Sequence, residues 1–166
     1  MALKVVITGA SSGIGEALAR HYASRGAQLG LIARRAERLE KLASTLSPAP
    51  ALYALDVRDA SGMRNAAGDF IARFGVPDIV VANAGVSRGA LTEHESDLDV
   101  FQQLFDINVI GMVNTFHPFI NPMREKGAGT LTGIASVTGF RGIPGAGAYS
   151  ASKAAAIKYC ESLRVE

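Results

Sequence analysis

The sequence predicts an α/β fold with a doubly wound parallel sheet, and three observations support this prediction. Short apolar runs alternate with longer helical stretches along all 166 residues, which is the pattern of repeated βαβ units. Runs such as residues 79–81 are apolar on both faces, as expected of strands that are covered by helices on each side. A glycine-rich turn separates the first apolar run from the first helical stretch, an arrangement typical of nucleotide-binding sheets.

The individual elements follow from the local pattern. Apolar runs of strand length predict strands at residues 3–7, 28–33, 51–55, 78–82 and 130–135. The stretches between them predict helices at residues 13–25, 36–46, 60–74 and 97–124, and a last helix that starts near residue 146 and runs to the terminus. Pro118 and Pro122 should bend or end the long helix, because proline has no backbone N–H group. Right-handed crossovers then predict a Rossmann-type sheet with strand order 3-2-1-4-5.

Composition and charge favour one globular domain over a nucleic-acid-binding or membrane protein. The content of hydrophobic residues, 48%, is enough to fill a core. The formal net charge of +2 is too small to predict a nucleic-acid track or a membrane-surface patch. The single cysteine, Cys160, cannot form an internal disulfide, which suits the reducing cytoplasm. The first apolar run is too short for a signal peptide or a membrane span.

The glycine-rich turn predicts a phosphate-binding loop. Its glycines allow the backbone to approach a pyrophosphate closely, and the helix that follows offers free N–H groups at its N-terminus. The spacing G-x-x-x-G-x-G differs from the general dinucleotide fingerprint G-x-G-x-x-G. A tight turn without a ligand is the alternative interpretation. We expect cofactor contacts from Gly9, Ser11, Ser12, Gly13, Ile14 and Gly15.

The residues after the second strand indicate which nucleotide binds. In this type of sheet an acidic residue in that region binds the ribose 2′-hydroxyl of NAD, whereas arginine accommodates the 2′-phosphate of NADP. Here the strand ends in Ala33-Arg34-Arg35, and a guanidinium group matches the geometry of a phosphate. The two arginines could instead only solvate a helix N-terminus, where their charge would oppose the helix dipole. The sequence therefore predicts NADP as the cofactor, bound by Arg34 and Arg35.

A tyrosine and a lysine in the last helix are candidates for catalysis. Tyr149 and Lys153 are four residues apart, so their side chains share one face of the helix. Such pairs are common on helix surfaces, and the spacing alone favours that plain interpretation. Ser136 supports a catalytic role, because it follows the fifth strand and ligands bind at the carboxyl ends of such strands. Asn108, in Asn-Val-Ile-Gly, supports it as well.

Together, the Thr-Gly-x-x-x-Gly-x-Gly turn, Asn108, Ser136 and the Tyr-Ser-Ala-Ser-Lys segment at 149–153 resemble the short-chain dehydrogenase/reductase family. The resemblance implies that Tyr149 is the general acid or base, that Ser136 donates to the substrate oxygen and that Lys153 binds the nicotinamide ribose. It implies that Asn108 holds a water molecule in a proton relay. Further cofactor contacts are implied for Asp56, Val57, Asn83, Ala84 and Gly85, with Ala82 in place of the first Asn of the family motif.

The resemblance also implies an activity and an assembly. The expected reaction is hydride transfer between NADP(H) and a carbonyl compound or secondary alcohol. A homodimer or homotetramer is expected, paired through the helices that contain Asn108 and Tyr149. For Asp56, the alternative to a cofactor contact is that its side chain only caps a helix. The substrate entrance is expected to be formed partly by Phe140, Arg141, Ile143 and Pro144.

The resemblance also implies that the chain is incomplete at its C-terminus. Family members continue beyond this length, so residues 1–166 are expected to form one dinucleotide-binding and catalytic domain that lacks its C-terminal strands, with an exposed edge on the fifth strand. A non-catalytic NADP-binding regulatory module, or an inactive fragment, is the alternative. No metal is expected, because the three histidines, His21, His94 and His117, do not have the spacing of metal ligands.

Overall fold

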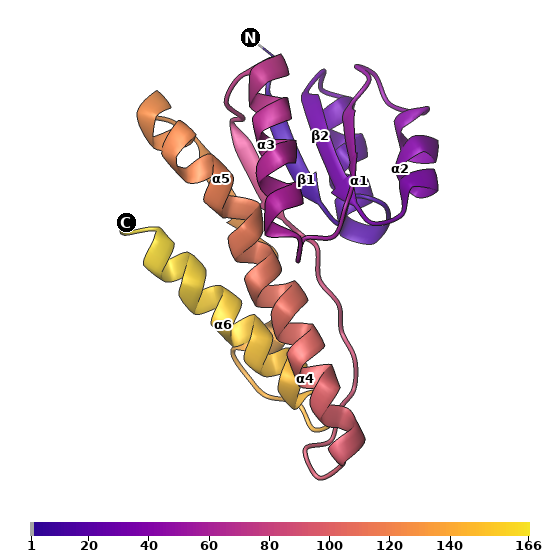
Figure 1. Ribbon diagram of the computed structural model, residues 1–166, viewed down its shortest axis with the longest axis vertical. Coiled ribbons are helices and arrows are strands. Elements are labelled where there is room, and N and C mark those ends of the chain that lie inside the picture. Colours follow the sequence, from indigo (N-terminus) through magenta and orange to yellow (C-terminus); the bar gives the residue numbers. More distant parts are fainter. Residues whose placement is uncertain (1) are drawn as a thin grey trace.

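A computed structural model describes residues 2–166, and its centre is a five-stranded parallel sheet (Figure 1). The strands lie in the order β3-β2-β1-β4-β5, which confirms the predicted α/β fold and its strand order. Within residues 2–166, β5 pairs only with β4 and forms one edge of the sheet, which confirms the expected open edge of the fifth strand. The strands are β1 (Lys4–Thr8), β2 (Gln28–Ala33), β3 (Ala51–Ala54), β4 (Ile79–Ala82) and β5 (Thr130–Gly133).

Helices cover both faces of this sheet. Helices α1 and α2 lie on one face, and α3, α5 and α6 lie on the other (Figure 1). No helix within residues 2–166 is long and apolar enough to cross a membrane. The helices are α1 (Gly13–Ala23), α2 (Ala36–Ala43), α3 (Ala60–Phe74), α4 (Leu98–Phe105), α5 (Gly111–Lys126) and α6 (Gly147–Leu163), with the short turns η1 (Glu95–Asp97), η2 (Asp106–Ile110) and η3 (Val137–Gly139).

The two faces of β1 show how the core is divided. Successive side chains of a strand point to opposite faces, so Ile7 packs in the layer under α1 and α2, whereas Val6 packs in the layer under α3 and α5. Phe70 of α3 is buried in the second layer next to Gly30 of β2, where a Cβ atom would lie 2.8 Å from the ring. Burial of a side chain of this size contributes about 1.5–3 kcal/mol. The glycine therefore lets α3 pack closely on the sheet.

The long helix predicted at residues 97–124 consists of α4 and α5, which are joined by the π-helical turn η2. Pro118 and Pro122 both lie inside α5, so the expectation that they end the helix is wrong. Buried side chains such as Phe116 hold this stretch against the sheet, and this packing outweighs the local cost of the prolines. The helix ends at Gly127, whose φ of 69° is the left-handed conformation common at helix C-termini.

Candidate active site

A cleft of about 420 Å³ lies at the carboxyl ends of all five strands. Its walls come mainly from the residues that directly follow each strand, and α6 adds two side chains, Tyr149 and Lys153. This is the edge at which open parallel sheets bind their ligands. The volume lies within the usual range for small-molecule sites. The cleft is therefore the candidate active site.

The phosphate loop packs tightly against the segment that follows β4. Gly9 has a φ of +66°, and a Cβ atom on it would lie 2.8 Å from Cα of Ala84. A Cβ atom on Gly15 would press into the carbonyl oxygen of Gly9 and the side chain of Asn83. Only glycine fits at these two positions, so the backbone of the loop can come close to a ligand in the cleft.

The N-terminus of α1 provides the donors that a phosphate group needs. Ser12 is the N-cap residue, and within the described chain its hydroxyl accepts no capping hydrogen bond from the first turn. The N–H groups of that turn and the positive end of the helix dipole are therefore available to an anion. Nη2 of Arg35 donates to the hydroxyls of Ser11 and Ser12, at 3.1 Å each. This set of donors fits a bound phosphate.

Asn83 ties the end of β4 to the end of β1. Its Nδ2 donates to the carbonyl oxygens of Thr8 (3.0 Å) and Gly9 (3.3 Å). The buried hydroxyl of Thr8 accepts from the backbone N–H groups of Asn83 (3.1 Å) and Ala84 (3.2 Å). Ala82 is buried at the end of β4. The side chain of Asn83 thus fixes the loop after β1, although Ala82 stands in place of the first Asn of the motif.

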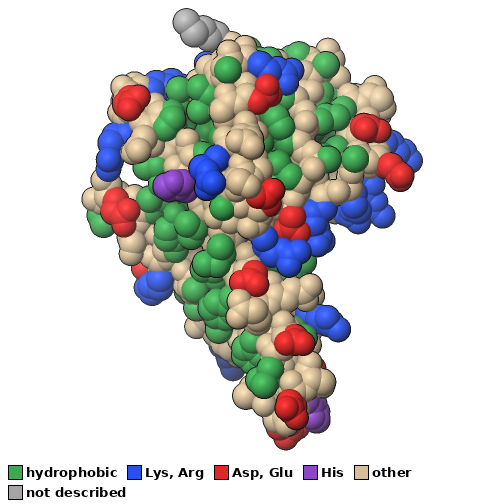
Figure 2. Space-filling model, in the orientation of Figure 1, with side chains coloured by type: hydrophobic (Ala, Val, Ile, Leu, Met, Phe, Trp, Pro, Cys, Tyr) green, Lys and Arg blue, Asp and Glu red, His purple; other side chains and the backbone are tan. Residues whose placement is uncertain are grey.

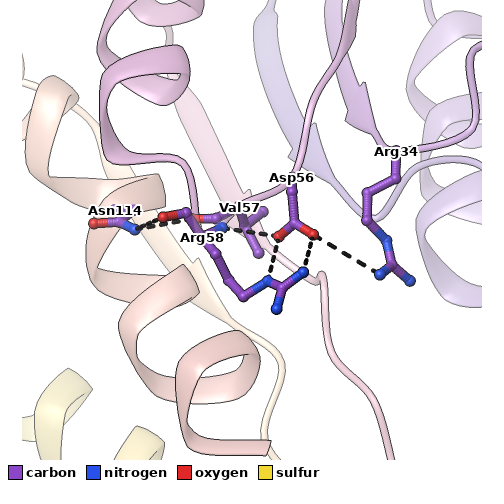
Figure 3. Close-up of polar contacts among 5 residues, drawn as sticks. All are labelled: Arg34, Asp56, Val57, Arg58 and Asn114. Carbon is purple, nitrogen blue, oxygen red and sulfur yellow. Dashed lines mark hydrogen bonds and ion pairs between the residues drawn. The ribbon is translucent and has the colours of Figure 1, made fainter. Parts of the chain in front are cut away.

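Asp56 lies between two arginines at the edge of the cleft (Figure 3). Arg58 binds the carboxylate with Nη2 at 2.9 Å and Nε at 3.1 Å, and Nη1 of Arg34 lies 3.8 Å away. The hydrogen bonds from Arg58 hold the pKa of Asp56 below its usual value. The cap of α3 is Asp59, which accepts from two backbone N–H groups of the first turn. The alternative that Asp56 caps this helix is therefore wrong.

The turn after β3 is anchored to α5. Nδ2 of Asn114 donates to the carbonyl oxygen of Val57 at 2.9 Å (Figure 3). The side chain of Val57 is buried and borders the cleft. Gly111 leaves room for it, since a Cβ atom there would lie 2.6 Å from Cγ2 of Val57. The wall of the cleft at this point is therefore set by helix packing as well as by the sheet.

Tyr149 and Lys153 both border the cleft from α6. Lys153 is only 5% exposed, its Nζ donates to the carbonyl oxygen of Ile134 at 2.7 Å, and this nitrogen lies 5.9 Å from the centre of the Tyr149 ring. Burial lowers the pKa of Lys153. The interpretation of these two residues as a solvated surface pair is therefore wrong, because the ammonium group is inside the protein.

Asn108 is buried beneath the cleft, in the π-helical turn. Its Nδ2 donates to Val86 O and to Ser152 Oγ, both at 3.0 Å, and its Oδ1 accepts from Val86 N at 2.9 Å. The side chain thus joins the segment after β4 to α6. In this arrangement Asn108 holds the backbone of the cleft wall in place.

Ser136 follows β5 by a few residues, next to Ala135, which borders the cleft. Its hydroxyl accepts hydrogen bonds from Oγ1 (3.0 Å) and N (3.3 Å) of Thr138. Because both lone pairs are engaged, the hydroxyl hydrogen of Ser136 is left to donate elsewhere. The loop that follows carries the residues expected at the substrate entrance. All of these are exposed, with Phe140 at 83% and Ile143 at 50%.

The structure therefore gathers most of the predicted site residues around one cleft. Those that border it are Gly9, Ser11, Ser12, Ile14, Arg34, Arg35, Asp56, Val57, Asn83, Ala84, Gly85, Tyr149 and Lys153. Those that lie behind or beside its wall are Gly13, Gly15, Asn108 and Ser136. Several supporting side chains were not assigned a role from the sequence. Thr8 and Ser152 lie within the motifs already described, whereas the only signal for the others was a hydrogen-bonding group close to a predicted residue in sequence or on a facing helix: Arg58, Asn114 and Thr138.

Comparisons with known proteins agree with this arrangement. A family model described as short chain dehydrogenase matches residues 3–166. The chain is 39% identical over 166 residues to 11-beta-hydroxysteroid dehydrogenase-like 4A of Arabidopsis thaliana, with 98% of this chain and 55% of that relative covered. The chain thus spans about half the length of the curated relatives it matches.

Two solved structures are similar over almost the whole chain. An alcohol dehydrogenase from the archaeon Thermococcus sibiricus, complexed with 5-hydroxy-NADP, has 33% identity and a TM-score of 0.90, covering 99% of this chain and 71% of that one. L-sorbose reductase from Gluconobacter frateurii, complexed with NADPH and L-sorbose, has 28% identity and a TM-score of 0.91, covering 99% and 64%. The arrangement of strands and helices is thus shared with nucleotide-dependent oxidoreductases.

Proposed function

Because this chain belongs to the short-chain dehydrogenase family, we propose that the complete protein transfers a hydride between NADP(H) and a carbonyl compound or secondary alcohol. The main supporting observation is that Tyr149 and Lys153 border the same cleft as the phosphate loop and the two arginines after β2. A nicotinamide nucleotide bound there would supply or accept the hydride. The chain itself would hold the nucleotide and move the proton.

Separate parts of the cleft would hold separate parts of the nucleotide. The N–H groups at the start of α1, together with Ser11, Ser12 and Arg35, would bind the pyrophosphate. Arg34 would bind the 2′-phosphate, because its side chain is 60% exposed at the edge of the cleft. Asp56 would contact the adenine.

Tyr149 would move the proton on the substrate oxygen. When a carbonyl compound is reduced, the phenol gives its proton to that oxygen, and in alcohol oxidation the phenolate takes the proton back. The ammonium group of Lys153, which is buried nearby, stabilises the phenolate by its positive charge. The free hydrogen of the Ser136 hydroxyl would be donated to the same substrate oxygen.

The preference for NADP rests on the end of β2. Ala33 stands where an acidic side chain would select NAD, and Arg34 and Arg35 follow it. The Thermococcus and Gluconobacter proteins were solved with NADP-type nucleotides. Calorimetric titration of the chain should give a dissociation constant for NADP at least about tenfold below that for NAD, a difference of about 1.4 kcal/mol. Equal affinities, or a ratio unchanged by Arg34→Ala, would contradict the preference.

Activity is tested on the protein made from the whole reading frame. A panel of ketones, aldehydes and secondary alcohols with NADPH or NADP should reveal turnover, followed by the absorbance of the reduced nicotinamide. Binding of NADP without turnover of any substrate in the panel would instead favour a non-catalytic, regulatory module. The proposed location is the cytoplasm, for which the one thiol, Cys160, is suited.

The proposed assembly is a homodimer or homotetramer that pairs through the helices containing Asn108 and Tyr149. Leu98 and Ile110, on α4 and the π-helical turn, are 55% and 50% exposed. Figure 2 shows hydrophobic side chains running down the narrow part of the molecule below the sheet, which α4 and the start of α6 form. An apolar surface of this kind supports association with a second copy.

A further inference from the structure

The two oxygens of Asp56 are unequally shared between its arginine neighbours (Figure 3). Oδ1 accepts from N (2.9 Å) and Nε (3.1 Å) of Arg58, and Oδ2 accepts from Nη2 of Arg58 at 2.9 Å. Nη1 of Arg34 approaches Oδ2 only to 3.8 Å, beyond hydrogen-bonding distance. The carboxylate is thus held by Arg58, and Arg34 stays loosely associated with it.

The backbone of this turn does not depend on the guanidinium group of Arg58. Asn114 of α5 donates to the carbonyl oxygens of Val57 (2.9 Å) and Arg58 (3.5 Å) from the other side (Figure 3). The side chain of Arg58 is 46% exposed and does not border the cleft. Removal of its charged head would therefore leave the turn in place. Oδ1 of Asp56 would keep the backbone N–H of residue 58, whereas Oδ2 would lose its hydrogen bond.

With Oδ2 free of Arg58, the carboxylate of Asp56 would compete with a phosphate for Arg34. Carboxylate and phosphate are both matched by the forked donors of a guanidinium, and both form close, charge-assisted hydrogen bonds with it. The side chain of Arg34 is 60% exposed and lies next to Oδ2 already. A small movement would bring it into a close ion pair with a carboxylate that Arg58 no longer occupied.

We propose that Arg58 is a positioning residue for nucleotide selection: it occupies the carboxylate of Asp56, so that Arg34 remains available to the 2′-phosphate of NADP. The inference rests on the proposed function, since it concerns how this chain distinguishes NADP from NAD. NAD has no 2′-phosphate, so its affinity does not depend on where Arg34 lies. Arg58 therefore acts on the ratio of the two affinities, through Asp56 and without contact to the nucleotide.

The test is a double-mutant cycle on the ratio of the dissociation constants of NAD and NADP, measured by calorimetry on the purified chain. Arg58→Met should lower the preference for NADP about fivefold, the scale of one partly exposed ion pair. Asp56→Asn combined with Arg58→Met should restore it, because no carboxylate remains to hold Arg34. Any loss of an adenine contact at Asp56 weakens both nucleotides equally and leaves the ratio unchanged.

Arg73→Met is the matched control. Arg73 is about as exposed as Arg58, and its Nη1 lies 3.1 Å from the carboxylate of Asp69. Neither Arg73 nor Asp69 borders the cleft. This variant should keep the wild-type ratio. A shift as large as that of Arg58→Met would show a general effect of charge and would overturn the inference.

The remaining outcomes separate the inference from the proposed function. If Arg34→Ala lowers the preference but Arg58→Met does not, the inference is wrong and the NADP preference stands. If Arg58→Met lowers it and the double variant fails to restore it, Arg58 acts on the phosphate directly and the inference is again wrong. If neither nucleotide binds, or if Arg34→Ala leaves the ratio unchanged, the proposed preference fails and the inference fails with it.

Discussion

Lys153 has a charged group that is almost fully buried, and this gives the folded chain a defined response to pH. Burial lowers the pKa of Lys153, so the unfolded chain binds this proton more tightly than the folded chain does. The free energy of unfolding should therefore rise with pH between the lowered pKa and about 10.4, the value of a free lysine. Lys153→Met should remove this rise in urea unfolding measured at several pH values. Lys158→Met, at a position 77% exposed, should keep it, and equal slopes in all three proteins would contradict the prediction.

Tyr149 is expected to act through its hydroxyl alone. Tyr149→Phe should lower kcat of the complete enzyme by about 10²–10⁴-fold, the usual contribution of a general acid or base. Its dissociation constant for NADP should stay the same, because the ring remains in the wall of the cleft. Tyr159→Phe is the matched control on the same helix, since Tyr159 stacks on Phe116 away from the cleft. Substantial turnover by Tyr149→Phe would remove the assigned role.

Thr138 is expected to orient the hydroxyl of Ser136. Its Oγ1 lies 3.0 Å from Ser136 Oγ, and as a donor it leaves the Ser136 hydrogen free for the substrate. Thr138→Val keeps the shape of the side chain but loses the donor, so kcat should fall about fivefold, equivalent to one hydrogen bond of about 1 kcal/mol. Thr138→Ser should retain the wild-type kcat. If the two variants have the same kcat, the hydroxyl of Thr138 has no positioning role.

Single residues were predictable from the sequence where a short-range rule applied. The spacing of Tyr149 and Lys153 places them on one helix face, and the structure has both in the cleft. The pairing of Asp56 with Arg58 was not predictable, because a long, flexible side chain could reach several partners and only the packed turn decides which. The same holds for Thr138, whose bond to Ser136 depends on the short η3 turn.

Whole elements were predictable where hydrophobic periodicity dominates. Alternating apolar strands and helical stretches, joined by right-handed crossovers, predicted the observed order β3-β2-β1-β4-β5. The prediction was weakest in the long helix, because the rule for Pro118 and Pro122 is local, whereas the packing of α5 on the sheet is not. Ends of elements also moved by a few residues, as at β5, which stops at Gly133.

The contact between the phosphate loop and α1 leads to a prediction about glycine. Gly15→Ala would place a methyl group against the carbonyl oxygen of Gly9 and the side chain of Asn83, so the loop must shift and NADP affinity should fall more than tenfold, or more than about 1.4 kcal/mol. Gly68→Ala is the control, because a Cβ atom there meets nothing within 4 Å and should stabilise α3 by about 0.5–1 kcal/mol. Calorimetric titration with NADP measures the affinity of each variant, and thermal unfolding measures its stability. Unchanged affinity in Gly15→Ala would show that the loop can adjust.

At the scale of the whole molecule, the chain has two uneven parts. The sheet and its helices form a wide part, and α4 with the start of α6 extends below it (Figure 1). Lys and Arg side chains gather where the two parts meet (Figure 2), and the cleft has two exposed arginines, Arg34 and Arg35. The cleft is therefore lined by positive charge next to the ends of β2 and β3, whereas the extension has apolar side chains on its surface.

Association through this extension should be sensitive to a single charge. Leu98→Glu or Ile110→Glu would put a carboxylate into the proposed interface, where each apolar side chain contributes about 1.5–3 kcal/mol on burial, so the dimer dissociation constant should rise more than about tenfold. Leu3→Glu is the control, since Leu3 is similarly exposed, at 41%, next to the start of β1. Light scattering after gel filtration at micromolar concentration should show the wild type and Leu3→Glu as oligomers and the other two variants shifted to monomer. A monomeric wild type would exclude this interface for residues 1–166, and an oligomer that survives both charges must pair through another surface.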